Sequence, residues 1–499
     1  MKRLKEILLN IQKLSSAASV LHWDQETYMP EGGGAFRADQ LAYLSLLKHQ
    51  MATGKKIRHE LERHIDYDSG KIINITLSKD EKRLVQLVRK DLKKLTALPD
   101  DFVEEMSRHV SNSQQAWIKA RKNSDFSAFS PYLEKMIALK KQEAEYYGYE
   151  DKPYDALLDD FEPGMTTDRI ARLFDGLKVR LVALVERIQA QEQIDATVLK
   201  QKFDTKEQWS FGMKIAEAIG LDMKHARQDV SVHPFTIGLH PDDVRITTRL
   251  NEEALLSGLF STIHESGHAI YEQGLSKEHY GTPLGESASF GIHESQSRLW
   301  ENMIGRSREF WSYALPLLQT YFPQLKETGL EEWYRMINVV KPSLIRVEAD
   351  EVTYSLHIML RFDIESRMIN EDIKVSDLPD LWNAGMKEYF GIEPKNDAEG
   401  ILQDVHWSMG GVGYFPSYAM GNLYGAQIFE QAKKDIPDLY GKTGAGDFLP
   451  LTTWLKKNVH LQGRRYDPEK LIEVISGKPL SPDPFMDYLE KKYTEIYRL

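Results

Sequence analysis

Apolar residues recur three and four positions apart through most of this 499-residue chain, and this spacing constrains the fold more than any other feature. The segment from Asp175 to Gln193 is a clear case. Leu4, Ile7 and Leu8 begin the same pattern near the N-terminus, where charged residues interrupt it in a way that a signal peptide would not. The sequence therefore predicts a mostly α-helical protein, and its length permits a large core without requiring separable domains.

One short stretch departs from the helical spacing. Between Asp229 and Thr248, large apolar and β-branched residues alternate with smaller or polar ones around a His-Pro-Asp sequence at 240–242, which predicts a short β-hairpin. Asp243, Arg245 and Thr247 would share one face of its second strand. The alternating residues are Val230, Val232, Phe235, Ile237, Leu239, Val244 and Ile246.

The composition excludes several classes of protein. The chain has no cysteine, so His, Asp and Glu are its only strong metal ligands. With 64 basic and 75 acidic residues the net charge is −11, which argues against nucleic acid as a partner. The longest charge-free run, residues 407–429, contains five glycines and a proline and is not expected to enter a membrane. Without a recognisable targeting signal, we expect a cytoplasmic protein.

The chemistry is concentrated just after the expected hairpin. Residues 251–274 predict a helix, because Asn251 suits its start and Gly274 its end. His264 and His268 stand one helical turn apart on one face, so both imidazoles can reach a single ion. Glu265 lies at the edge of that face, where it can take a proton from a water molecule. Two nitrogen ligands and such a carboxylate indicate a zinc hydrolase.

An alternative is that the histidines are an exposed pair without a ligand. The flanking residues argue against it, because the two histidines would adjoin a buried apolar stripe and buried imidazoles need partners. The residues of this stripe are Leu255, Leu256, Leu259, Phe260, Ile263 and Ile270.

A catalytic zinc site needs a third protein ligand. Glu294 opens a second helical segment about 25 residues later, beside His293, and has the residue type and placement that thermolysin-like sites use. Glu301 is the other acidic candidate. Glu294 could instead pair with Arg298, four residues on, as a surface salt bridge. We favour Glu294 as the ligand.

Six motifs together make the chain resemble the carboxypeptidase Taq family of zinc metallocarboxypeptidases, and the resemblance covers essentially the whole chain. They are His233-Pro234-Phe235, Asp243-Val244-Arg245-Ile246-Thr247, His264-Glu265-Ser266-Gly267-His268, His293-Glu294-Ser295-Gln296, Ile345-Arg346-Val347-Glu348-Ala349-Asp350 and Gly400-Ile401-Leu402-Gln403-Asp404-Val405-His406-Trp407.

The resemblance implies a single domain over residues 1–499, with its motifs within 233–407. Its fold would be one large, mostly helical unit with a deep active-site groove and a small hairpin or sheet beside the zinc helix, as in neurolysin and angiotensin-converting enzyme. It implies one Zn²⁺ bound by His264, His268 and Glu294, with Co²⁺ as a substitute ion, and Glu265 as general base. Family members are typically homodimers that remove single amino acids from peptide C-termini with broad preference.

Removal of C-terminal residues requires a positive group for the substrate carboxylate, and arginine suits this because its fork donates two parallel hydrogen bonds. Arg346 is the first candidate, since the family motif places it in the groove. Arg245, on the polar hairpin face, is the second. Arg346 could instead pair with Asp350, four residues on.

The reaction also needs a donor to the tetrahedral intermediate. His406, Tyr418 and His233 are candidates that the sequence does not rank. Gln403, Asp404 and Trp407 are expected in the pocket floor. Asp350 or Asp404 could equally orient a zinc-bound histidine.

Two other functions stay open. An oligopeptidase that cuts peptides internally would use the same zinc chemistry, and a helical scaffold would hold the histidines incidentally or bind zinc only structurally. Glu265 argues against the scaffold. The strand edge beside the zinc helix could pair with an extended peptide, which would explain broad specificity.

Overall fold

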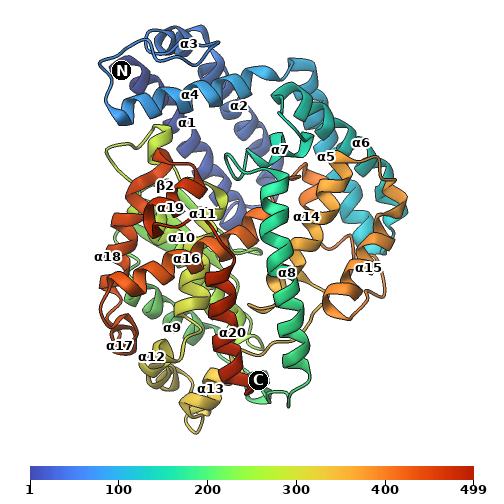
Figure 1. Ribbon diagram of the computed structural model, residues 1–499, viewed down its shortest axis with the longest axis vertical. Coiled ribbons are helices and arrows are strands. Elements are labelled where there is room, and N and C mark those ends of the chain that lie inside the picture. The colour runs from blue at the N-terminus through green and yellow to red at the C-terminus, as the bar shows by residue number, and fades with distance from the viewer.

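The computed structural model describes residues 1–499 and is mostly helical, as the apolar spacing predicts (Figure 1). The two chain ends lie far apart along the long axis of the molecule. The first nine helices are α1 (Lys2–Thr27), α2 (Gly34–Thr53), α3 (Lys55–Glu62), α4 (Lys79–Ala97), α5 (Asp100–Asn123), α6 (Phe126–Tyr147), α7 (Pro153–Leu158), α8 (Thr167–Gln189) and α9 (Thr205–Ala218).

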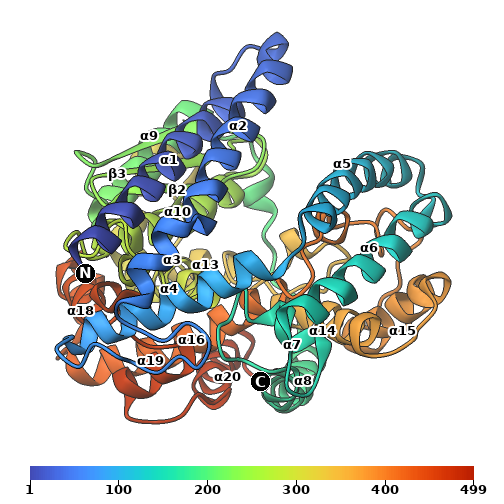
Figure 2. The same ribbon diagram turned by 90° about the horizontal axis from the view of Figure 1, so that it is seen from above.

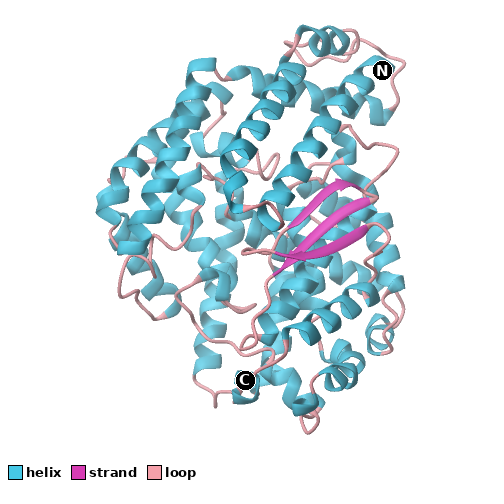
Figure 3. Cartoon of the chain, turned by 180° about the vertical axis from the view of Figure 1, so that it is seen from behind, coloured by secondary structure: helices cyan, strands magenta, loops and turns pink.

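The only sheet has three strands, β1 (Ala226–Val230), β2 (Thr236–His240) and β3 (Asp243–Thr248), in the order β1-β3-β2 (Figure 3). The predicted hairpin is β2 with β3, which pair antiparallel. Its expected first strand is too long, because Val230 ends β1 and Val232 lies in the following loop. Strand β1 was not predicted as a separate strand. It pairs parallel to β3 and lacks the alternation of β2.

The second half of the chain returns to helices. They are α10 (Leu255–Gly274), α11 (Phe290–Arg298), α12 (Arg308–Tyr321), α13 (Leu330–Met336), α14 (Tyr354–Asn370), α15 (Leu378–Phe390), α16 (Pro416–Asp435), α17 (Leu439–Gly444), α18 (Leu449–Asn458), α19 (Pro468–Ser476) and α20 (Asp483–Tyr497). A π-helical turn, η4 (Leu299–Ile304), continues α11 directly.

Helix α10 begins four residues later than predicted and ends at the predicted Gly274. The Asn251 side chain does accept a backbone hydrogen bond, from Glu253 N, but in a turn before the helix. The apolar stripe is buried as expected, except that Leu256 is only half-buried. This stripe joins a core cluster of 97 buried residues.

A smaller cluster of 11 buried residues connects α1, α3 and α4. Figure 2 shows these N-terminal helices on one side of the molecule, with α5, α6, α14 and α15 on the other. The expectation of one domain over residues 1–499 stays a prediction.

Four layers position the site: the sheet lies against α10, α10 against α11, and α11 against α16. The layers approach closely where glycines replace side chains. A Cβ atom added to Gly267 on α10 would lie 2.7 Å from Ser297 Cα, and one added to Gly421 on α16 would lie 2.6 Å from Glu294 Cγ. The glycine-rich charge-free run therefore includes most of a buried helix in close contact with α11. No helix of the protein combines the length and apolarity needed to cross a membrane.

Candidate active site

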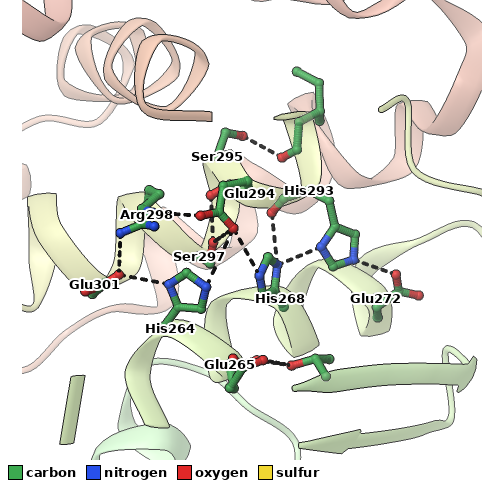
Figure 4. A network of polar contacts seen from close by, with 12 residues as sticks. His264, Glu265, His268, Glu272, His293, Glu294, Ser295, Ser297, Arg298 and Glu301 are labelled. Carbon is green, nitrogen blue, oxygen red and sulfur yellow. Dashed lines mark hydrogen bonds and ion pairs between the residues drawn. The ribbon is translucent and has the colours of Figure 1, made fainter. Parts of the chain in front are cut away.

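Helices α10 and α11 bring three potential metal ligands together (Figure 4). One ligand atom from each of His264, His268 and Glu294 lies within 4.8 Å of the other two. Glu294 Oε2 is 3.6 Å from His264 Nε2 and 3.4 Å from His268 Nε2. Two ligands bound tetrahedrally at about 2.0–2.1 Å stand about 3.3–3.4 Å apart, so these separations suit an ion of zinc's size.

The geometry of Glu294 is compatible with both sequence interpretations of this residue. Its Oε1 accepts a hydrogen bond from Arg298 Nε at 2.7 Å, as the salt-bridge alternative supposed. This pair is buried rather than on the surface, and Oε2 remains directed at the two imidazoles. Arg298 therefore holds Glu294 in the orientation in which its second oxygen faces the histidines.

The outer nitrogen of each histidine has its own partner. His264 Nδ1 donates to Glu301 Oε2 at 2.8 Å, and His268 Nδ1 donates to the backbone oxygen of His293 at 3.1 Å. Glu301, the alternative third ligand, thus lies behind His264. Each Nε2 is left facing Glu294, which is the arrangement a shared ion requires.

The expectation that Asp350 or Asp404 orients a zinc histidine is not met. Asp350 instead accepts backbone hydrogen bonds from Lys341, Val352 and Thr353, which also explains why Arg346 does not pair with it. The chain leaves helical geometry after Glu348, so the predicted spacing of four residues does not bring Arg346 and Asp350 together.

Burial and charge act differently on the two imidazoles. Burial lowers the pKa of His264, but Glu294 and Glu301 outweigh it and bring that pKa to about 9. Burial and the neighbouring His293 lower the pKa of His268 to about 3. Burial would raise the pKa of Glu294, yet Arg298 and the histidines hold it well below its ordinary range. A carboxylate behind one imidazole and a carbonyl behind the other account for much of this difference.

Glu265 lies on the sheet side of the same helix. Its Oε2 accepts a 2.6 Å hydrogen bond from the hydroxyl of Thr236, the first residue of β2. Burial raises the pKa of Glu265, which brings the carboxylate closer to the strength that a general base needs near neutral pH. The predicted hairpin thus supplies the residue that orients Glu265.

His293 and Glu272 extend the network beyond His268, and sequence reasoning gave neither a role. His293 Nδ1 lies 2.6 Å from His268 Nδ1, and His293 Nε2 donates to Glu272 Oε1 at 2.7 Å. Glu272 is one turn after His268 on α10, so the i, i+4 spacing was a signal that could have been used.

Arg346 lies in a buried cluster beside the metal-binding group. Its Nη2 and the Nη2 of Arg361 donate to different oxygens of Asp404, at 2.8 Å and 2.5 Å. Gln403 Oε1 accepts from Arg346 N and from Arg361 Nη2. Two guanidinium groups thus share one carboxylate, and Gln403 positions both arginines.

Tyr354 connects this cluster to the metal-binding group. Arg346 Nη1 donates to the Tyr354 hydroxyl at 3.1 Å. The guanidinium carbon of Arg298 stands 4.0 Å from the centroid of the Tyr354 ring, and Arg298 itself holds Glu294. Only two side chains therefore separate Arg346 from a potential metal ligand.

His406 and Tyr418 lie next to the arginine cluster. The His406 ring is 6.3 Å from the Tyr418 ring, and the Arg346 guanidinium is 5.0 Å from the Tyr418 ring. Burial lowers the pKa of His406 to about 4, because Arg346 and Arg361 offset the attraction of Asp404. Burial raises the pKa of Tyr418 well above 10. Both side chains are therefore neutral hydrogen-bond donors near pH 7.

Trp407, which was also expected in the pocket floor, has a structural role instead. Trp407 is buried and donates its indole N–H to Glu365 at 2.7 Å. Tyr414, which the sequence analysis overlooked in the glycine-rich run, packs its ring 5.2 Å from Tyr418. Glu294 contributes to the raised pKa of Tyr414, after burial, so this hydroxyl lies near the metal-binding group.

Arg245 and His233 are not brought to the metal-binding group. Arg245 makes a two-pronged pair with Asp243 at 3.0 Å and covers the Trp23 ring of α1 at 4.7 Å. His233 is exposed in the loop between β1 and β2, where its carbonyl accepts from Ser231. Placement on the hairpin was therefore insufficient to predict proximity to the histidines.

A cavity of 480 Å³ adjoins the site on the side of Glu272. Gly238 of β2, Glu272 of α10 and Phe290 of α11 contribute to its walls. Space for an extended molecule thus lies beside the edge of β2, and the side chain of Glu272 connects this space to His293.

The comparisons with known proteins agree with this geometry. The profile of the carboxypeptidase Taq (M32) metallopeptidase family matches residues 3–493. Carboxypeptidase 1 of Bacillus subtilis strain 168 is 39% identical over 501 residues, covering 100% of this chain and 99% of that protein.

Solved structures show the same likeness. The M32 carboxypeptidase of Deinococcus radiodurans R1 superposes with a TM-score of 0.96 at 39% identity, covering 100% of this chain and 99% of that one. Trypanosoma cruzi metallocarboxypeptidase 1 superposes with a TM-score of 0.93 at 32% identity, covering 99% of both chains. With its candidate metal-binding group and these relatives, the chain belongs to the carboxypeptidase Taq (M32) family of metallopeptidases and is a peptide hydrolase.

Proposed function

We propose that the protein is a zinc-dependent carboxypeptidase that removes single amino acids, one after another and with broad specificity, from the free C-terminus of peptides. The observation that carries this proposal is the convergence of His264, His268 and Glu294, with Glu265 beside them on the same helix. Zn²⁺ is favoured because two imidazoles and one carboxylate are its ligands in hydrolases of this kind, and Co²⁺ would suit the same donors.

An ion held by these ligands supplies a Lewis acid and lowers the pKa of water. Glu265 takes the proton from the attacking water and passes it to the departing amine. Thr236 keeps the carboxylate of Glu265 in place while it does so. His406 and Tyr418 are the neutral donors available to the oxygen of the scissile carbonyl.

The arginine cluster supports cleavage at the C-terminus rather than internally. Arg346 and Arg361 carry two positive charges and Asp404 one negative charge, while the lowered pKa of His406 keeps that ring neutral. A buried surplus of one positive charge is costly alone, and a substrate carboxylate would compensate it. We assign this carboxylate to Arg346 rather than to Arg361, because Arg346 keeps an exposed fraction of 6% and Arg361 has none.

The free edge of β2 supports broad specificity. This strand is at the edge of the sheet and begins at Thr236, which contacts Glu265. A peptide paired with it would be held by its backbone, so its side chains would contribute little to affinity. The Leu239 carbonyl already accepts from Ser16 and Tyr280, which leaves the Thr236 end of the edge for substrate. We further propose a homodimer in the cytoplasm.

Mass spectrometry of a peptide ladder tests the proposal. Incubation with a free-acid peptide should yield products shortened by one residue at a time from the C-terminus, and the C-terminally amidated peptide should remain intact. Internal fragments from both peptides would instead indicate the oligopeptidase.

Two variants separate the metal from the base in this assay. Glu265→Gln should retain zinc and lose most turnover, whereas Glu294→Ala should lose zinc. A folded Glu265→Gln protein without zinc would contradict the assigned roles. Arg346→Gln should raise KM for free-acid peptides. If the variant lost residual activity on amidated peptides to the same extent, a role of Arg346 in binding the substrate carboxylate would be excluded.

A further inference from the structure

A second cavity, of 410 Å³, lies among helices α12, α16, α17 and α20. Its lining includes none of the metal-binding or substrate-binding residues described above. Its volume is in the range of small-molecule sites, about 300–1,000 Å³. Part of its wall is aromatic and apolar, from Met303, Tyr334, Phe429, Tyr440 and Tyr488.

Three charged side chains in this cavity have no oppositely charged partner within 4.0 Å. They are Lys433, Lys491 and Glu309. The other charged lining residues are all engaged in ion pairs, namely Arg308 with Glu495, Glu430 with Lys434, Asp487 with Arg180 and Lys492 with Glu351. The cavity thus offers two free positive groups and one free negative group.

Lys433 lies beside the aromatic wall, and Lys491 and Glu309 line the same cavity. Lys433 Nζ stands 5.2 Å from the centroid of the Phe429 ring and 5.9 Å from that of Tyr440. Burial, and then the charge of Lys491, lower the pKa of Lys433, so the two amines are close enough to repel each other. Burial and the charge of Glu309 raise the pKa of Tyr440 to about 12, so Glu309 lies near the same ring.

We propose that this cavity binds a free α-amino acid with an apolar or aromatic side chain. Lys433 and Lys491 bind its carboxylate, Glu309 binds its ammonium group, and the rings of Phe429 and Tyr440 enclose its side chain. A carboxylate between the two lysines removes their mutual repulsion. The ligand belongs to the class of compound that a carboxypeptidase releases, so the site would sense product, although the binding itself does not depend on the proposed catalytic mechanism.

The π-helical turn η4 joins this cavity to the metal-binding group. Met303 lines the cavity, and the hydroxyl of Tyr488, another lining residue, donates to the backbone oxygen of Asn302 at 3.0 Å. Glu301, in the same turn, accepts from His264. An occupant of the cavity therefore contacts the turn that orients a metal ligand, and π-helical turns are frequent at such functional positions.

Fluorine NMR with 4-fluoro-L-phenylalanine tests the proposal. The Glu265→Gln protein, which should turn over peptides very slowly, is first saturated with a free-acid peptide, so that the catalytic site is filled. We expect the probe to bind one further site per chain. Lys433→Met combined with Lys491→Met should weaken this binding at least tenfold, while Lys456→Met, an exposed lysine outside the cavity, should leave it unchanged.

A carboxylate analogue tests the class of ligand. Glu309→Gln should weaken 4-fluoro-L-phenylalanine but not 3-(4-fluorophenyl)propionate, which lacks the ammonium group. Loss of all probe binding once the peptide is bound would overturn the proposal, as would unchanged binding in the double lysine variant. When Glu265 is retained, the double lysine variant should hydrolyse peptides at the wild-type rate. This result separates the amino-acid site from the proposed catalytic function.

Discussion

The two imidazoles of the candidate metal-binding group are fixed from behind by different chemical groups. Glu301 accepts from His264 and the His293 carbonyl accepts from His268, so both Nε2 atoms face the same point. Such partners fix the ring orientation and increase the basicity of the ligand. Their removal typically lowers metal affinity about 10–100-fold. The carboxylate partner makes His264 the more basic of the two, and binding an ion there displaces a proton.

At the residue scale, the hydroxyl of Thr236 is expected to matter for turnover. Thr236→Val removes the hydrogen bond to Glu265 without removing β-branching, and hydrogen bonds to charged groups contribute about 1.5–3 kcal/mol. We expect kcat to fall by about tenfold or more, with KM and bound zinc nearly unchanged. Thr236→Ser should restore activity. Equal activity of the Val and wild-type enzymes would show that Glu265 needs no such support.

A buried histidine outside the metal-binding group makes stability depend on pH. Burial lowers the pKa of His460 to about 3, and its Nε2 pairs with Gln296. The unfolded chain takes up the proton near pH 6.5 and the folded one does not, so stability falls as pH drops below about 6.5.

For His460 alone this loss amounts to about 2 kcal/mol between pH 7 and pH 5. In His460→Gln, which has no titrating ring, the free energy of unfolding in urea should fall by about that much less over the same interval. The same fall in both proteins would show that His460 is protonated in the folded state.

Sequence spacing was sufficient to propose the residues that meet through local geometry. His264 and His268 converge because they are one helical turn apart, and Glu294 was proposed from its residue type and its place in the next helical segment, α11. It was insufficient for Thr236 and Tyr354, since their contacts with Glu265 and Arg346 depend on packing between separate elements. A single sequence has no signal for such long-range pairs.

At the scale of elements, the separation between α11 and α16 sets the position of Glu294. Gly421 on α16 leaves room for the Glu294 side chain, and Gly425, one turn later, leaves room for the backbone of Ser295. This contact accounts for glycines in the charge-free run at residues 407–429, because any side chain at Gly421 would push the two helices apart.

Gly421→Ala should therefore weaken both stability and metal binding. The added Cβ would lie 2.6 Å from Glu294 Cγ, and overpacking of this kind costs about 1–3 kcal/mol. Calorimetry and zinc titration would measure the two effects. Gly176→Ala in α8 is the matched control, since a Cβ there has no neighbour within 4 Å and should stabilise the helix by about 0.5–1 kcal/mol. Unchanged zinc affinity in Gly421→Ala would show that Glu294 adapts.

Element boundaries were predicted unevenly for a physical reason. The end of α10 at Gly274 and the β2–β3 pairing follow from local residue preferences, and both were predicted. The start of α10 was predicted too early, because it depends on how the chain leaves β3. Strand β1 was missed, because it forms only by pairing across the sheet.

At the scale of the whole molecule, the metal-binding group is attached to the largest core. Helices α10, α11 and α16 contribute residues to this core. Arg298 holds Glu294 and Glu301 holds His264 through hydrogen bonds that do not involve an ion. The mostly helical class was predicted from periodicity, whereas the arrangement of some twenty helices was expected only from the family resemblance, because periodicity does not specify which helices pack together.

Removal of the ion should leave the fold intact. A ligand present at 1,000 times its Kd stabilises by about 4 kcal/mol, which for a chain of this length corresponds to about 4 °C in Tm. After treatment with a chelator, we expect an unchanged far-ultraviolet circular dichroism spectrum, a Tm lower by a few degrees and no peptidase activity until zinc is restored. Loss of helical signal on chelation would contradict a core that supports the ligands independently.

The free edge of β2 has a consequence for how successive residues would be removed. Neighbouring residues of a paired strand face opposite sides, so a shift of one position reverses every side chain and breaks the hydrogen-bond register. A shortened peptide cannot slide forward by one residue while it remains paired with the edge. It must detach, turn over and return, so the enzyme is expected to work distributively, releasing its peptide after each cut.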